Sequence, residues 1–169
     1  PEKTWGKLWH LRGELLTLVG DFGGAEASFT VAMDHANKAK DIELESTLLS
    51  CLAELAWKRG DSTLALDLHR QALKRFITIK NSIGASRTYT NMSYIFRSQG
   101  KKQLAMDAHS EVEHILGNEK NPDLVHARIN LARSYLEMGE LELGREHALK
   151  AYDETQSNED EITHSRARA

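Results

Sequence analysis

The 169-residue sequence predicts an all-α solenoid of four antiparallel helical hairpins plus the start of a ninth helix. Two sets of marker residues recur at the same spacings of 40, 40 and 39 residues, and prolines occur at only two positions. Self-similarity at a fixed period indicates one helical unit stacked several times. The two sets are Gly20, Gly60, Gly100 and Gly139, and Asp41, Asn81, Asn121 and Asp160.

Each marker glycine is expected to end the first helix of a hairpin, because glycine adopts positive φ without a Cβ clash. Each Asp or Asn marker is expected to cap the first helix of the next hairpin by accepting hydrogen bonds from its free N–H groups. Pro122 follows the third of these markers, at a first-turn position where proline is tolerated. The units are then about residues 1–40, 41–80, 81–120 and 121–159, with a partial unit at 160–169, all within one repeat domain, 1–169.

Apolar and small residues support each helix in turn. The first helices repeat mostly apolar positions eight and four residues before the glycine, which places them on one helical face. The second helices repeat small residues five and twelve residues after it, which lets two helix axes approach closely. We therefore expect helices at about residues 4–19, 25–38, 42–59, 63–79, 82–99, 103–117, 122–138 and 142–156, with a ninth beginning near Glu161.

The charge balance and the cysteine content limit the class of protein. A net charge of -3 and a pI near 6.3 disfavour direct binding to nucleic acid or to a membrane. Cys51 is the only cysteine, so no intramolecular disulfide can form, which agrees with a cytoplasmic location. The chain starts at Pro1 and lacks polar capping repeats, so we interpret it as a fragment of a larger protein. The uncapped ends would also allow homo-oligomerisation.

Two stretches resemble the tetratricopeptide repeat (TPR) in a longer form of about 40 residues. They are Leu52–Asp61 (LAELAWKRGD) and Leu131–Glu140 (LARSYLEMGE), each with a leucine, a small residue, an aromatic residue and a Gly-acid turn. The resemblance implies a right-handed superhelix whose first helices line a concave surface. Arrays of this type are similar to those of bacterial transcription activators, signalling ATPases and kinesin-light-chain-like proteins, where they bind peptides, proteins or small regulators.

The resemblance also implies that the exposed face of each first helix contacts the ligand. On that face, Glu14 and Glu54 would repel a peptide carboxylate. Arginines and aromatic residues gather in the second half, which predicts an acidic segment bound over the third and fourth hairpins. The alternative is that these arginines pair with Glu54, Glu137 and their neighbours on a solvated face. The candidate ligand-binding residues are Trp57, Arg87, Tyr94, Arg97, Arg133, Glu14, Glu54 and His126.

The sequence predicts no catalytic group, no metal site and no cofactor. His69 and His109 occupy equivalent repeat positions, which favours a structural slot between helices over a metal ligand. Cys51 is assigned to packing. Trp5 and Trp9 lie four residues apart and are assigned to the core rather than to an exposed stacking surface.

We therefore expect a protein- or peptide-binding scaffold, the partner-docking part of a larger regulatory protein, and not an enzyme. The alternative is a small-molecule or signalling-peptide sensor domain that controls an attached output domain. A sensor requires an enclosed pocket lined by aromatic residues, whereas a docking scaffold requires an open groove with several anchors.

Overall fold

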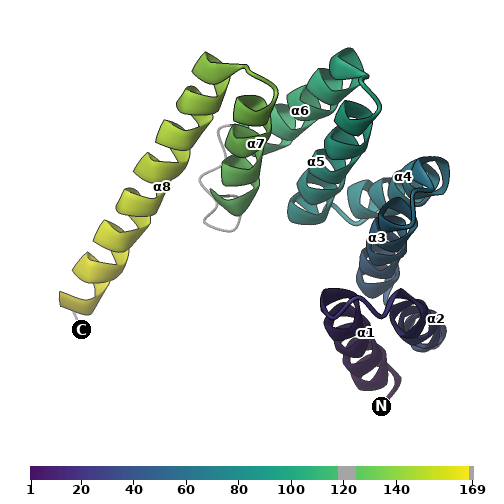
Figure 1. Ribbon diagram of the computed structural model, residues 1–169. Coiled ribbons are helices and arrows are strands. Elements are labelled where there is room, and N and C mark those ends of the chain that lie inside the picture. The colour runs from purple at the N-terminus through teal and green to yellow at the C-terminus, as the bar shows by residue number, and fades with distance from the viewer. Residues whose placement is uncertain (118–124, 168–169) are drawn as a thin grey trace. The chain divides into compact units, whose positions relative to one another are not determined.

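The computed structural model describes the backbone of residues 1–117 and 125–167, and the side chains of these residues except 126 and 157–167. The described residues form eight α-helices and no strand (Figure 1). Two compact units are present, unit 1 (Pro1–Thr88) and unit 2 (Tyr89–Ala169), with the division inside α5. The helices are α1 (Glu2–Leu18), α2 (Phe22–Ala39), α3 (Ile42–Lys58), α4 (Ser62–Thr78), α5 (Ser82–Ser98), α6 (Lys102–Leu116), α7 (Val125–Glu137) and α8 (Leu141–Ala167).

The all-α fold class and the succession of helical hairpins are confirmed. Within unit 1, α1 packs on α2 and α3 packs on α4; within unit 2, α7 packs on α8. The eight helices lie within a few residues of the predicted ranges wherever the backbone is described, except at the end of α8. The positions of the repeat markers therefore determine where the helices begin and end.

The turn inside each hairpin has the expected backbone conformation. The four marker glycines have φ between +71° and +88°, and a Cβ at any of them would meet no atom within 4 Å. Glycine is thus required there for its conformation and not for space. In the first two hairpins the next residue caps the second helix, because Asp21 and Asp61 accept hydrogen bonds from the N–H groups of Gly24 and Leu64, both at 2.9 Å.

The Asp/Asn markers between hairpins also act as caps. Asp41 accepts a hydrogen bond from the N–H of Leu44 at 3.2 Å, and Asn81 accepts one from the N–H of Gly84 at 2.8 Å. These bonds satisfy donors that the first turn of a helix leaves free. Asn121 lies outside the described residues.

The fourth of these markers does not begin a new helix, which corrects the sequence prediction. Asp160 lies inside α8, which runs unbroken for 27 residues, so the expected ninth helix is absent from the described chain. Residues 145–167 contain neither glycine nor proline. An Asp or Asn can cap a new helix only where the preceding helix has ended, and no helix-ending glycine or proline precedes Asp160 in α8.

Unit 1 contains an apolar cluster with close approaches between helices. Phe29 on α2 is 1% exposed and lies against Gly13 of α1, where a Cβ would come within 2.3 Å of its ring. Phe76 on α4 meets Gly84 of α5 in the same way, at 2.4 Å. Small residues therefore let the aromatic rings fill the space between helices, as the sequence pattern predicts. The buried cluster is Ala25, Phe29, Ala32, Ala36, Leu44, Leu48 and Leu55.

The core of unit 2 contains a hydrogen-bonded polar network. His109 Nε2 lies 2.8 Å from Ser93 Oγ, and the His109 ring packs edge-on against Tyr135 with ring centroids 4.8 Å apart. The Tyr135 hydroxyl donates to Glu113, whose carboxylate also lies 3.1 Å from His147 Nε2. These hydrogen bonds offset part of the desolvation of the buried polar groups, although Nδ1 of His109 and Nδ1 of His147 are buried without a hydrogen-bond partner among the described residues.

An ion pair adds to the polar core of unit 2. Arg128 on α7 is 5% exposed. Its Nη2 and Nε lie 3.0 and 3.1 Å from the two carboxylate oxygens of Glu154 on α8. This is the bidentate geometry in which a guanidinium and a carboxylate match best.

The predicted structural role of the two equivalent histidines is confirmed. His69 and His109 are 1% and 0% exposed. Burial lowers the pKa of each to about 4, so both rings are neutral at physiological pH. They occupy the repeat position that Phe29 fills in the first hairpin, and each places a buried ring there.

The prediction for the two N-terminal tryptophans is half correct. Trp9 packs against the unit 1 core, whereas Trp5 is 53% exposed. Trp5 belongs to a row of exposed apolar side chains along α1 that continues through Leu8 and Leu15.

None of the described helices has the length and the hydropathy that a membrane crossing requires.

Candidate functional site

Unit 1 contains a cavity of about 330 Å³ between α1 and α3, here called the α1–α3 cavity. Leucines of α1 form its apolar wall, and Glu14, Cys51 and Glu54 form its polar wall. The Glu14 carboxylate lies 3.6 Å from His10, and the Glu54 carboxylate lies 3.5 Å from Lys58. Two carboxylates of the predicted ligand-binding face therefore border one cavity. The lining residues are Leu11, Glu14, Leu15, Thr17, Leu18, Phe29, Cys51 and Glu54.

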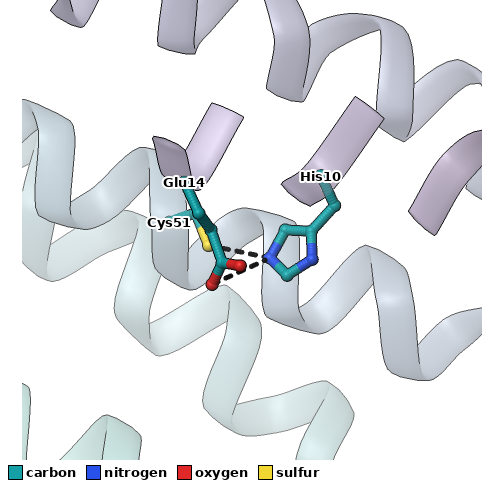
Figure 2. Close-up of side chains that lie close together, drawn as sticks. All are labelled: His10, Glu14 and Cys51. Atoms are coloured by element: carbon teal, nitrogen blue, oxygen red, sulfur yellow. Dashed lines mark hydrogen bonds and ion pairs between the residues drawn. The ribbon is translucent and has the colours of Figure 1, made fainter. Parts of the chain in front are cut away.

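Beside this cavity, His10, Glu14 and Cys51 form a compact group, here called the His10–Glu14–Cys51 cluster (Figure 2). His10 Nε2 lies 3.5 Å from Cys51 Sγ and 3.6 Å from Glu14 Oε1. One donor atom from each residue lies within 4.8 Å of the other two. Burial, and then the carboxylates of Glu14 and Glu54, raise the pKa of the Cys51 thiol to about 12. Cys51, which the sequence assigned to packing, thus also contacts His10, and His10 in turn pairs with Glu14.

A second cavity of unit 1, about 200 Å³, lies between α3 and α5. Arg87 on α5 borders it, with Thr47 and Ser50 of α3 opposite. The Arg87 guanidinium forms no ion pair with any residue in the described part of the chain. This cavity therefore offers a cationic donor, in contrast to the acidic α1–α3 cavity.

Unit 2 carries the third group, formed by Tyr94, Arg97 and Arg133. The Arg97 guanidinium carbon lies 5.1 Å from the centroid of the Tyr94 ring, within the range of a cation–π contact. Arg97 also pairs with the Glu137 carboxylate. Burial and Glu137 raise the pKa of Tyr94, whereas Arg133 and Arg97 act to lower it. The phenol is therefore within electrostatic reach of both guanidinium groups.

Two predicted site residues, Trp57 and His126, belong to none of these groups. Trp57 on α3 is 39% exposed in unit 1. The side chain of His126 lies outside the described residues. The pairing of arginines with nearby acids, left open by the sequence, holds for Arg97 with Glu137, while Arg133 forms no ion pair among the residues whose side chains are described.

Two features of the sites were not predicted from the sequence. Leu11 and Leu15 are half exposed at the α1–α3 cavity, where the repeat alignment gave no reason to expect an apolar wall. The proximity of His10 to Cys51 is the second such feature, although the two residues stand ten and nine positions before successive marker glycines. Residues at nearly the same distance from the marker glycine, on the first helices of consecutive hairpins, can lie side by side. That relation is the signal in the sequence that predicts the contact between His10 and Cys51.

Comparison with known proteins supports the assignment of the fold. The family model of the tetratricopeptide repeat matches residues 43–116. The structure of BtubC (BKLC) from P. vanneervenii aligns with a TM-score of 0.66 at 16% identity, over 94% of this chain and 66% of that chain. A search of curated protein sequences gives no match.

Two further solved structures are similar. A putative kinesin light chain of Podosopora anserina with nearly identical TPR-like repeats aligns with a TM-score of 0.61 at 15% identity, over 89% of this chain and 74% of that chain. MamA aligns with a TM-score of 0.54 at 15% identity, over 92% and 81%. Residues 43–116 therefore belong to the tetratricopeptide-repeat family, and the chain has the TPR-like helical-repeat fold, whose members are in general non-catalytic scaffolds for protein–protein interaction.

Proposed function

We propose that this chain is the docking part of a regulatory protein and that it binds an acidic segment of a protein partner through Tyr94, Arg97 and Arg133. The observation that carries the proposal is the Arg97 guanidinium beside the half-buried Tyr94 ring in unit 2, with Arg133 within electrostatic reach of the same phenol. A carboxylate can accept two parallel hydrogen bonds from a guanidinium fork, and an apolar neighbour can pack on the phenol ring. The three side chains together suit an acidic segment that carries an apolar residue.

The cost of binding at this group is low. Arg133 is exposed, and a partner carboxylate there would break no ion pair among the described side chains. Arg97 would exchange Glu137 for the partner, and exposed pairs of this kind contribute only about 0–1 kcal/mol. The contact between Arg97 and Tyr94 holds the guanidinium in place before binding.

Selection from a display library of short random peptides tests the proposal. We expect the peptides enriched on the purified chain to contain Asp or Glu next to an apolar residue. A variant carrying Arg97→Glu and Arg133→Glu should bind a selected synthetic peptide at least about tenfold more weakly, measured by fluorescence anisotropy. Binding should also weaken as salt rises, because exposed charges are screened.

Arg145→Glu on α8 is the control, since it makes one Arg→Glu change, half the charge change of the double variant, at an exposed position of unit 2 outside the proposed site. It should leave the affinity within about twofold of the parent. Enrichment of peptides without acidic residues would refute the proposal. Equal loss of affinity in the control would show that net charge, and not this site, determines binding.

A further inference from the structure

The His10–Glu14–Cys51 cluster brings three kinds of metal-binding group together outside the proposed docking site. His10 supplies an imidazole nitrogen, Glu14 a carboxylate and Cys51 a sulfur. His10 and Glu14 lie four residues apart on α1, so both project from one face of that helix, and Cys51 reaches them from α3 (Figure 2). Two packed helices therefore set the positions of the groups.

Two of the three separations within the cluster match the edges of a tetrahedral zinc site. With Zn–N and Zn–O bonds of about 2.0–2.1 Å and a Zn–S bond of about 2.3 Å, neighbouring ligand atoms stand roughly 3.3–3.6 Å apart. The distance from Cys51 Sγ to His10 Nε2 is 3.5 Å, and that from His10 Nε2 to Glu14 Oε1 is 3.6 Å. The third separation is at most 4.8 Å, and the Glu14 side chain is 51% exposed and free to rotate inward.

The charges around the cluster also favour a cation. The carboxylates of Glu14 and Glu54 both act on the Cys51 thiol, Arg87 acts in the opposite sense, and Lys58 pairs with Glu54 at 3.5 Å. Glu14 and Glu54 border the α1–α3 cavity together with Cys51, so an ion at the cluster would be reached from that cavity. A divalent cation there would be stabilised by negative charge on two sides.

We propose that His10, Glu14 and Cys51 bind one Zn²⁺ ion that joins α1 to α3, with a water molecule in the fourth position on the cavity side. Sulfur and imidazole ligands select zinc over magnesium or calcium, which take oxygen ligands. On binding, the S–H bond of Cys51 breaks, its proton goes to solvent and a Zn–S bond forms, with no change in oxidation state. The site is separate from the Tyr94, Arg97 and Arg133 group and adds a metal to a scaffold whose sequence predicted none.

Titration of the metal-free chain, without a histidine tag, tests the site. Competition with a chromophoric chelator should show one Zn²⁺ ion bound per chain. Co²⁺ should give the thiolate-to-metal charge-transfer absorption in the near ultraviolet that is specific to sulfur coordination. Cys51→Ser should abolish that absorption and weaken Zn²⁺ binding by at least about tenfold, since changes even in the outer shell of a zinc site have effects of this size.

Two further variants keep the test decisive if Cys51→Ser perturbs folding. His10→Gln and Glu14→Gln alter partly exposed positions, and each should weaken Zn²⁺ binding while the circular dichroism spectrum is unchanged. His35→Gln is the matched control, because His35 pairs with Glu2 at 2.5 Å in the same unit but has no thiol in the contact. No stoichiometric binding, or binding that His35→Gln weakens as much as His10→Gln, would overturn the proposal.

Discussion

The first and third hairpins, one in each unit, fill the same position of the repeat with different chemistry. In the first hairpin, in unit 1, Phe29 packs on Gly13 in an apolar contact, whereas the second hairpin of the same unit has the buried His69 at this position. In unit 2 the equivalent residues are His109 and Ser93, which form a hydrogen bond. The TPR-like backbone therefore requires a ring opposite a small residue at this position, and it accepts either an apolar or a polar pair.

The difference extends beyond one pair. Unit 2 also buries Arg128 against Glu154 and joins Tyr135 to His147 through Glu113. Packing stabilises unit 1, so it should respond most to changes of volume. Hydrogen bonds and charge stabilise unit 2 to a larger extent, so it should respond most to the loss of one partner and to pH.

The aromatic residues allow the two responses to be measured separately. All three tryptophans lie in unit 1 and all four tyrosines lie in unit 2. Tryptophan fluorescence therefore follows the unfolding of unit 1, and tyrosine absorbance follows that of unit 2. Denaturation monitored by both signals assigns each effect below to a unit.

The largest effect is expected from breaking the buried ion pair of unit 2. Glu154→Leu should destabilise unit 2 by about 3 kcal/mol, because it leaves the Arg128 guanidinium buried without a counter-charge. Adding Arg128→Met should recover a large part of this loss. If the double variant is as unstable as the single one, the penalty does not come from the orphaned charge. Asp34→Asn, which breaks an exposed pair with Lys38 in unit 1, should change stability by less than about 0.5 kcal/mol.

A change of volume should act next most strongly, and in unit 1. Gly13→Ala should destabilise that unit by about 2 kcal/mol, since its Cβ would lie 2.3 Å from the Phe29 ring. Gly23→Ala is the control, because a Cβ there meets only an Asp21 oxygen at 3.8 Å, and it should be neutral or stabilising. A neutral Gly13→Ala, detected as an unchanged tryptophan transition, would mean that α1 and α2 are not held at this close approach.

Acidification should distinguish the units through their buried histidines. Burial lowers the folded-state pKa of His69 in unit 1 and of His109 and His147 in unit 2. The unfolded chain therefore takes up protons first, and stability falls as the pH drops from about 6.5 towards 4, by at most about 1.4 kcal/mol per pH unit for each histidine. With two such groups, unit 2 should lose more stability than unit 1 between about pH 7 and 5.

His69→Leu provides the test of this assignment. The variant should flatten the pH dependence of the tryptophan transition and leave that of the tyrosine transition unchanged. An equal pH dependence of both units in the parent chain would contradict the interpretation, because it would mean that His147 does not contribute. Denaturation by urea at a series of pH values measures both slopes.

The smallest effects are expected at the turns of unit 1. Lys40 and Lys80, between hairpins, have φ of 54° and 56°, values that glycine tolerates better than lysine. Lys40→Gly should stabilise unit 1 by up to about 0.5 kcal/mol, and Gly60→Ala should destabilise it by about 1 kcal/mol. Changes of the opposite sign would show that these turns relax to another conformation.

The repeat markers predicted the elements well because they act locally. A glycine at positive φ and an Asp or Asn at a helix start act within one turn, so Gly60, Asp41 and Asn81 could be interpreted without tertiary information. Asp160 shows the limit of this reasoning. A cap signal works only where the preceding helix ends, and α8 has no residue that ends it there.

The sites were harder to predict because they depend on contacts between helices. The offsets from the glycines placed Glu14 and Glu54 on one face, and the structure brings both to the α1–α3 cavity. The contact between His10 and Cys51 depends on how α1 and α3 are aligned along their axes, which a pattern along one chain does not contain. Trp5 looked like a core residue for the same reason, since spacing marks an apolar face without showing what covers it.

The exposed turns inside the hairpins have a consequence for engineering. Each marker glycine borders open space, and a foreign segment inserted beside one would displace no packed side chain. Closing a longer flexible loop costs little more than closing a short one, since the entropy of closure grows only with the logarithm of loop length. These turns are thus suitable insertion sites for an epitope or a fluorescent reporter. They recur once per repeat, and an insertion there would leave the helices between them unaltered.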